Sequence, residues 1–146
     1  GHADLNVIRN LVDSVSELKV IGNGDVCDWV SARRMFADTG CDAVMVARGC
    51  LGNPWVFSEI AADLRGESVP NAPSLEEKAK ILRRHVDLYV DTFGEDTTSR
   101  QIRKHLLWYF RNTPAEKVLR ARLSQIEGRV DIDDAISAAL EEQAKA

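Results

Sequence analysis

The chain has 146 residues, of which 45% are hydrophobic and 29% charged, and its formal net charge is −4 at pH 7. This composition is typical of a globular protein, and no apolar run approaches the roughly 20 residues that a membrane helix needs. The length excludes a complete (β/α)8 barrel, which takes about 250 residues. No signal-peptide layout opens the chain. We therefore expect a cytoplasmic protein without membrane contact, built as one domain or two small ones.

The first 66 residues carry the pattern of parallel strands joined by helices. In chain order we expect a helix over residues 4–16, a strand over 18–22, a helix over 26–40, a strand over 42–49, and a helix from Asn53 to about Gly66. Asp25 is the candidate N-cap and Gly40 the candidate stop of the helix over 26–40. Apolar strands joined through a helix by short loops indicate a parallel βαβ unit.

Two glycine-containing loops follow these two strands. The first is Gly22-Asn23-Gly24-Asp25, and the second runs from Ala47 to Gly52. Neighbouring parallel strands end at one sheet edge, so both loops should open on the same side. Glycines let the backbone approach a ligand closely, and N–H groups at a helix start favour an anion such as phosphate. For the first loop, a plain turn with an Asp cap is at least as good an interpretation; for Arg48, a salt bridge is the alternative.

After a linker over residues 67–73, the pattern over 74–146 is that of helices alone. Ser74 and Glu77 form a capping box for a helix over 75–93, which Gly94 ends. Further helices are expected over 98–111, from Pro114 to about Ile126 after a second capping box (Thr113 with Glu116), and over the last residues. The spacing turns these side chains inward: Leu75, Ala79, Leu82, Val86, Tyr89, Phe93, Ile102, Leu106, Tyr109, Val118, Leu119, Leu123, Ile126, Ile132, Ile136 and Leu140. We interpret this segment as a four-helix bundle.

The net charge conceals a basic stretch. Residues 100–129 contain eight basic side chains against two acidic ones, whereas residues 1–66 contain six basic and nine acidic ones. A solvated helix face is the simpler interpretation of such a run. A surface for a polyanion is the sharper one.

Of four ring side chains in the helical segment, His85 has one interpretation and the other three keep two. His85 is expected to pack at a helix interface. His105, beside Lys104, either contacts RNA or makes a buried hydrogen bond. Trp108 and Tyr109 fit the core by their spacing, and either could also stack on a base.

Three ordered motifs resemble the tRNA-dihydrouridine synthase family. KVIGNGDV (19–26) and GCDAVMVARGCLGNPWVF (40–57) are similar to the end of that family's barrel. SRQIRKHLLWYFRNTP (99–114) is similar to its C-terminal helical domain. Gly1-His2-Ala3-Asp4 resembles the G-x-A-D before the seventh barrel helix. The resemblance covers essentially the whole chain and is closest to the bacterial B-type branch.

The resemblance implies an α/β plus all-α fold and a flavin site. Residues 1–66 would be the last two βα units of a (β/α)8 TIM barrel, and 74–146 a tRNA-binding helical bundle. In the family, the loops after strands seven and eight hold the FMN phosphate, and the matching residues here are Asn23, Gly24, Asp25, Ala47 and Arg48. The family usually has glycine at position 47, so the alanine methyl could crowd the phosphate. A negative φ at Ala47 would still let its N–H serve.

The implied activity is the reduction of uridine in tRNA to 5,6-dihydrouridine. In the family NADPH reduces FMN, FMN passes a hydride to the base, and a cysteine acts as general acid. Since Ile102 points inward, at least one of the two basic residues that follow it, Arg103 and Lys104, should face outward. The candidates for contact with tRNA are Arg100, Arg103, Lys104 and Arg111.

No catalytic residue is expected in this chain. Cys27, Cys41 and Cys50 do not match the motif of the family's catalytic cysteine, and no His, Cys and carboxylate set has metal-ligand spacing. We therefore expect the chain to be inactive alone, without a metal. A free-standing RNA-binding or partner-binding module without catalysis is the alternative. Two short strands leave unpaired edges, so self-association or swapping through them is also expected.

Overall fold

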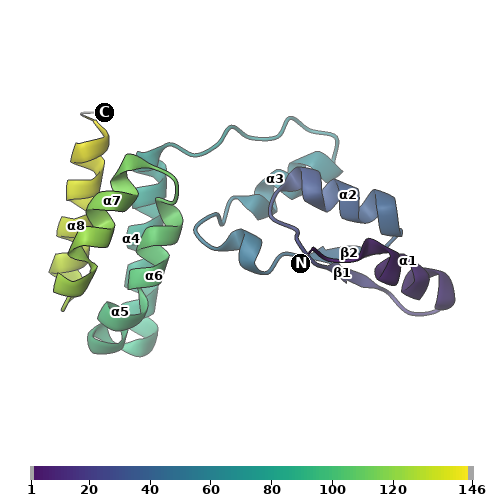
Figure 1. The fold of residues 1–146 in the computed structure, drawn as a ribbon, viewed down its shortest axis with the longest axis horizontal. Coiled ribbons are helices and arrows are strands. Elements are labelled where there is room, and N and C mark those ends of the chain that lie inside the picture. Colours follow the sequence, from purple (N-terminus) through teal and green to yellow (C-terminus); the bar gives the residue numbers. More distant parts are fainter. Residues whose placement is uncertain (1, 145–146) are drawn as a thin grey trace. The chain divides into compact units, whose positions relative to one another are not determined.

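The computed structural model describes residues 2–144, so Gly1 of the G-x-A-D motif lies outside the described residues. The chain divides between Asn71 and Ala72 into two compact units, here called unit 1 and unit 2 (Figure 1). Residues 67–74, around this division, have no helix or strand. Within residues 2–144, no helix has both the length and the apolar character needed to cross a membrane.

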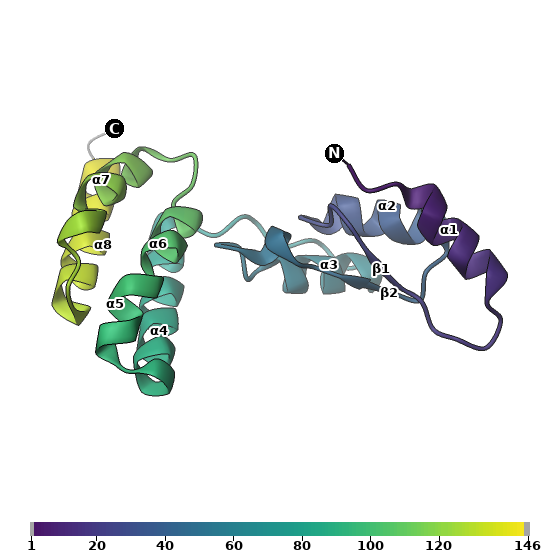
Figure 2. The same cartoon turned by 60° about the horizontal axis from the view of Figure 1, so that its bottom comes forward.

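Unit 1 combines helices with a small parallel sheet. Its elements are α1 (Leu5–Ser14), β1 (Ile21–Asn23), α2 (Trp29–Thr39), β2 (Ala43–Met45), a 3-10 turn (Arg48–Cys50) and α3 (Val56–Leu64). The two strands lie side by side (Figure 2) and pair in parallel, with Ile21 opposite Ala43 and Asn23 opposite Met45. This confirms the parallel βαβ unit, although each strand has only three residues and is shorter than expected.

The ends of α2 are set by local side-chain chemistry. Gly40 ends the helix in the left-handed conformation (φ 70°), as expected. The N-cap, however, is Asp28, which accepts the N–H of Ser31 at 2.7 Å, so the prediction of Asp25 as N-cap is wrong. Asp25 lies in the preceding turn with φ 53°. Likewise α3 begins at Val56, after a turn in which Asn53 accepts the Val56 N–H through its carbonyl.

The core of unit 1 is formed by the sheet region, α2 and α3. Its buried members are Val20, Val26, Ala32, Met35, Cys41, Val56 and Ile60. Gly22 faces this core, since a Cβ there would lie 2.8 Å from the Cys41 sulfur. Side chains alternate along a strand, so Ile21 and Met45 lie on the other face of the sheet, where 59% and 48% of their surfaces are exposed. One face of the sheet is therefore uncovered within unit 1.

The described part of unit 2, residues 72–144, contains helices and no strand. Its elements are α4 (Leu75–Phe93), α5 (Glu95–Gln101), α6 (Arg103–Tyr109), α7 (Pro114–Arg122), a 3-10 turn (Leu123–Gln125) and α8 (Arg129–Gln143). The helix expected over 98–111 is thus two, separated at Ile102, which keeps helical dihedrals (φ −68°, ψ −22°). The described part of unit 2 therefore has five α-helices rather than the four of the predicted bundle.

Capping boxes are predicted at the starts of α4 and α7, and the structure has the one at α4. Ser74 accepts the Glu77 N–H at 3.2 Å, and Glu77 accepts the Ser74 N–H at 2.7 Å. The second prediction is wrong, because the Thr113 hydroxyl donates backward to the Phe110 carbonyl. Glu116 instead accepts the N–H of Asn112, one residue before the expected partner.

Most of the inward-facing side chains of unit 2 are where the spacing puts them. Phe93 differs, because 55% of its surface is exposed. Five others are only partly buried: Leu75, Tyr89, Val118, Leu123 and Leu140. The confirmed core positions are Ala79, Leu82, Val86, Ile102, Leu106, Tyr109, Leu119, Ile126, Ile132 and Ile136.

Candidate functional site

The two glycine-containing loops meet at the carboxyl edge of the sheet. The parallel register places Asn23 and Met45, the last residues of β1 and β2, opposite each other. Gly49 of the second loop packs directly on the backbone that follows the first, since a Cβ at this position would overlap the Val26 carbonyl oxygen and the Cys27 Cα. Only glycine permits this approach, so the two loops form one surface.

The first loop is fixed by contacts to the beginning of the chain. Gly24 has φ 141°, and a Cβ there would overlap the side chain of Ala3. The Asp25 carboxylate accepts the Ala3 N–H at 2.7 Å and lies 3.4 Å from Nδ1 of His2. The Ala3 N–H, then His2 and the charge of Arg48, lower the pKa of Asp25. Asp25 therefore acts through its side chain as an anchor for residues 2 and 3.

The second loop presents an exposed arginine. Ala47 has φ −100°, which meets the condition for its N–H to serve a ligand, and it is exposed. The Cys50 thiol donates to the Ala47 carbonyl at 3.0 Å and so holds the turn. In the described part of the chain Arg48 forms no ion pair, and its side chain is exposed. The alternative of a salt bridge at Arg48 therefore has no support in this structure.

This arrangement suits an anion more than a metal. A fixed backbone rim with a neighbouring guanidinium matches the geometry of a phosphate group, which arginine binds through two parallel hydrogen bonds. Over residues 2–144, no three His, Cys, Asp or Glu side chains lie together so that they could hold a metal ion.

A cavity of about 380 Å³ adjoins the first loop. Gly24 and Asp25 contribute to its wall, as do Ser31 and Arg34 of α2. Sequence reasoning did not select Ser31 or Arg34, and no motif marks them. Arg34 is paired with Asp38 at 3.1 Å, one helical turn away.

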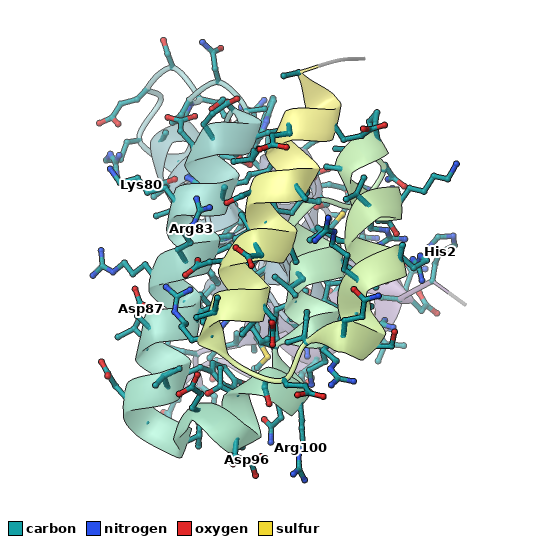
Figure 3. The ribbon with its side chains drawn as sticks, turned by 90° about the vertical axis from the view of Figure 1, so that its left-hand side faces the viewer. His2, Lys80, Arg83, Asp87, Asp96 and Arg100 are labelled. Carbon is teal, nitrogen blue, oxygen red and sulfur yellow. The ribbon has the colours of Figure 1, made fainter. Side chains whose placement is uncertain are left out.

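The four basic candidates of unit 2 separate into different environments. Arg100 is exposed and pairs with Asp96 (Figure 3) at 3.2 Å. Arg103 is half-buried, and its guanidinium donates to the carbonyl oxygens of Ser99 (3.2 Å) and Ile126 (2.8 Å). Lys104 and Arg111 are exposed. Arg103 is therefore part of the fold of unit 2, and Lys104 is the outward-facing neighbour of Ile102.

Five ring side chains form a continuous row across α4 and α6, here called the ring row (His85, Tyr89, Phe93, His105 and Trp108). Ring centroids lie 5.0 Å apart for Phe93–Tyr89, 5.3 Å for Tyr89–His85, 4.8 Å for His85–His105 and 4.9 Å for His105–Trp108. His85 packs at a helix interface, as expected. Sequence reasoning missed the row because spacings of four residues are equally typical of a core.

The two histidines of the ring row lack polar partners among the described residues. Nδ1 of His85 and Nε2 of His105 are buried without a hydrogen bond, so the interpretation of His105 as a buried hydrogen-bonding residue is not supported at this atom. Burial lowers the pKa of His85. Burial, the neighbouring His85 and Lys104 lower the pKa of His105 to about 4. Both rings are therefore neutral at pH 7.

Comparison with known proteins gives a consistent result. The dihydrouridine synthase (Dus) family model matches residues 1–145. A probable tRNA-dihydrouridine synthase of Mycobacterium leprae is 44% identical over 133 residues, which is 91% of this chain and 35% of that protein. A probable tRNA-dihydrouridine synthase of Rickettsia prowazekii is 30% identical over 94% of this chain and 42% of its own length. The tRNA-dihydrouridine synthase B of Proteus vulgaris is 34% identical over 97% of this chain and 43% of its own length. The chain thus spans about a third to two-fifths of these relatives.

Proposed function

This chain belongs to the dihydrouridine synthase family, and we propose that it is the C-terminal part of a tRNA-dihydrouridine synthase that uses FMN and NADPH. In this proposal unit 1 contributes the FMN phosphate site as the last two βα units of a TIM barrel, and unit 2 binds tRNA. The reaction takes place in the cytoplasm, where tRNA and NADPH are found.

The packing of the two loops at one sheet edge carries this proposal. The backbone of Asn23, Gly24 and Ala47 would surround the phosphate, and the exposed Arg48 would neutralise it. Asp25 would position the first loop through Ala3 rather than contact the phosphate, since its carboxylate already accepts the Ala3 N–H. FMN, when bound, supplies the hydride that reduces the uracil ring.

The chain alone would lack the general acid of this reaction. Cys41 is buried, and the Cys50 thiol donates to the Ala47 carbonyl. Cys27 is exposed, but it lies just after the phosphate-binding turn, and its surrounding sequence does not match the family's catalytic cysteine motif. Catalysis would then require residues from the remainder of the synthase.

Replacement of Arg48 in the complete synthase tests the flavin site. Arg48→Ala should weaken FMN binding about tenfold, which corresponds to about 1.4 kcal/mol, because one charge-assisted phosphate contact is lost. Titration of FMN fluorescence measures the dissociation constant. Arg65→Ala is the matched control, since Arg65 is also exposed in unit 1 but follows α3, away from both loops, and pairs with Glu67 at 2.7 Å. Equal FMN affinities of the two variants would contradict the assignment of Arg48.

The isolated 146-residue chain tests the division of labour between the units. It should bind tRNA with a marked salt dependence, because phosphate contacts by Lys and Arg release counterions. It should neither retain FMN through purification nor oxidise NADPH. A yellow preparation that consumes NADPH would show that the chain has a complete active site.

The uncovered face of unit 1 predicts self-association of the isolated chain. Ile21 and Met45 are exposed on that face, and an apolar groove of about 320 Å³ runs beside β2, with Val44, Phe57 and Leu64 among its lining residues. The remainder of the synthase would cover these surfaces in the complete protein, and a second copy would cover them in the isolated chain. Sedimentation should then show a concentration-dependent dimer, and a monomer at all concentrations would contradict this.

A further inference from the structure

The ring row is a feature of unit 2 that the flavin site does not use. His85, Tyr89 and Phe93 follow one another at intervals of four residues along α4, and His105 and Trp108 continue the row on α6, which packs beside α4. Phe93 is 55% exposed and the other four rings are partly exposed. By contrast, Leu82 and Val86 of α4 have no exposed surface. The ring row is therefore at the surface, beside the core.

Positive charge accompanies the ring row at its α6 end. Nζ of Lys104 lies 5.8 Å from the centre of the Trp108 ring. Arg111 follows α6, which ends at Tyr109, and its N–H donates to the Trp108 carbonyl at 3.4 Å, so Arg111 lies beside the last turn of α6. Both cations are exposed, and neither forms an ion pair with a described carboxylate closer than 4.0 Å.

Two carboxylates of α4, Asp87 and Asp91, lie between ring-row residues in sequence, and Asp87 is directed toward α8. Asp87 accepts from the guanidinium of Arg129 in α8 at 2.8 Å. Arg83, one turn before it, pairs with Asp133 of α8 at 3.2 Å. Figure 3 shows Arg83 and Asp87 along the same side of α4. The side of α4 that carries the ring row is thus distinct from the side that α8 occupies.

We propose that the ring row is a stacking surface for unpaired RNA bases, and that Lys104 and Arg111 hold the phosphates of the same strand beside Trp108. This inference rests on the proposed function, which makes RNA the partner of unit 2. Aromatic rings stack on any base, and flanking Lys and Arg neutralise the backbone between the stacked nucleotides. Since both histidines are neutral at pH 7, their rings contribute π-surface rather than charge.

Single-stranded and double-stranded RNA distinguish stacking from simple charge attraction. The isolated chain is titrated with a ten-nucleotide oligouridylate and with a ten-base-pair RNA duplex, and fluorescence anisotropy gives the affinities. Phe93→Ala should weaken binding of the single strand about tenfold and leave the duplex unchanged, because only unpaired bases can stack. Leu88→Ala is the matched control, since Leu88 lies on the same helix and is also 55% exposed but carries no ring. Phe93→Tyr should retain single-strand affinity.

Lys104→Ala supplies the second arm. It should weaken binding of both RNAs and reduce the salt slope of the logarithm of the binding constant by about one, as loss of one phosphate contact does. If Lys104→Ala and added salt weaken binding but Phe93→Ala binds the single strand as well as Leu88→Ala does, the ring-row proposal is overturned and the RNA-binding function of unit 2 stands. If Phe93→Ala changes only the association state of the chain, the row is a protein interface and the proposal is overturned. If the unaltered chain binds neither RNA at low salt, the function proposed for unit 2 is overturned with it.

Discussion

Unit 2 buries its large apolar side chains, whereas unit 1 leaves many of its own exposed. Of the twelve largest fully buried side chains among residues 2–144, ten belong to unit 2, and only Met35 and Val56 belong to unit 1. Of the twelve exposed large hydrophobic side chains, nine belong to unit 1. Both units contain helices of amphipathic pattern, so the difference lies in what those helices can pack against.

The contrast shows which unit can be stable on its own. In unit 2 five helices enclose a core, and ion pairs from Arg83 and Arg129 connect α8 to α4. In unit 1 the strands have three residues each, and Ile21 and Met45 remain uncovered. Two-stranded sheets are marginal without further strands or helices on their open face. We infer that unit 1 is stable only when another protein surface covers its open sheet face, and that unit 2 is stable on its own.

The largest expected effect is the loss of a core side chain of unit 2. Phe110 has no exposed surface. Phe110→Ala should lower the free energy of unfolding of unit 2 by about 3–5 kcal/mol, because it leaves a cavity in a closed core. Urea denaturation followed by far-UV circular dichroism measures this. Phe57→Ala in unit 1 is the control and should shift its transition by less than about 0.5 kcal/mol. Equal shifts would contradict the contrast between the two cores.

A smaller loss of stability is expected for Arg103→Ala, and the neighbouring exposed Lys104 provides the comparison. Arg103→Ala removes two hydrogen bonds and leaves the Ile126 carbonyl without its guanidinium partner, so unit 2 should lose about 1–3 kcal/mol. Lys104→Ala should leave the stability of unit 2 unchanged and weaken RNA binding instead. Urea midpoints and RNA titrations of both variants measure the two properties. If Arg103→Ala keeps full stability but binds RNA more weakly, Arg103 contacts RNA and its assignment to the fold of unit 2 is wrong.

Acid should destabilise unit 2 through the ring row. The pKa of His105 is lowered to about 4 in the folded chain, from an ordinary value of 6.5. Between these values the unfolded chain binds the proton more readily, so stability is complete above pH 6.5 and falls as the pH decreases toward 4. With allowance for solvent screening, the loss is about 1 kcal/mol.

His105→Phe is the matched variant for this acid effect. It removes one of the two titrating groups of the ring row, keeps a ring and leaves His85, whose pKa is also lowered, in place. Thermal unfolding at pH 7 and pH 5 measures the difference. The variant should lose less stability than the unaltered chain. The carboxylates cannot mimic this, because the lowered pKa values of Glu116 and Asp131 place their contributions at lower pH. Identical pH profiles of the two chains would contradict the role of His105.

Features that depend on neighbours in sequence could be predicted, and features that depend on distant contacts could not. The capping box of Ser74 and Glu77 and the left-handed stop at Gly40 need only a few residues, and both were predicted. Arg103 was assigned to RNA because its partner, the Ile126 carbonyl, lies 23 residues away. Asp25 was assigned to a helix cap because nothing local reveals its bond to Ala3, 22 residues earlier.

The candidate site was predictable in the same uneven way. The two loops could be placed together because parallel strands share their carboxyl edge, whatever the rest of the fold. The exposure of Phe93 could not be predicted from the sequence. Phe93 follows Tyr89 by four residues, a spacing that is also typical of core positions. The break at Ile102 divides the expected helix into α5 and α6, and this changes what lies opposite the end of α4.

The smallest effect is expected for the isolated surface ion pair of unit 1. Lys19 donates to Asp42 at 2.7 Å, a hydrogen bond that raises the pKa of Lys19, but 86% of the lysine side chain is exposed. Hydration and side-chain entropy offset such a pair, so Lys19→Ala should leave the urea midpoint unchanged. Arg129→Ala is the comparison in unit 2, where the arginine side chain is 27% exposed and its guanidinium pairs with Asp133 of α8 and Asp87 of α4. It should lower the midpoint clearly. If Lys19→Ala lowers the urea midpoint of unit 1 as much as Arg129→Ala lowers that of unit 2, surface ion pairs contribute more to the stability of unit 1 than the burial of apolar side chains does.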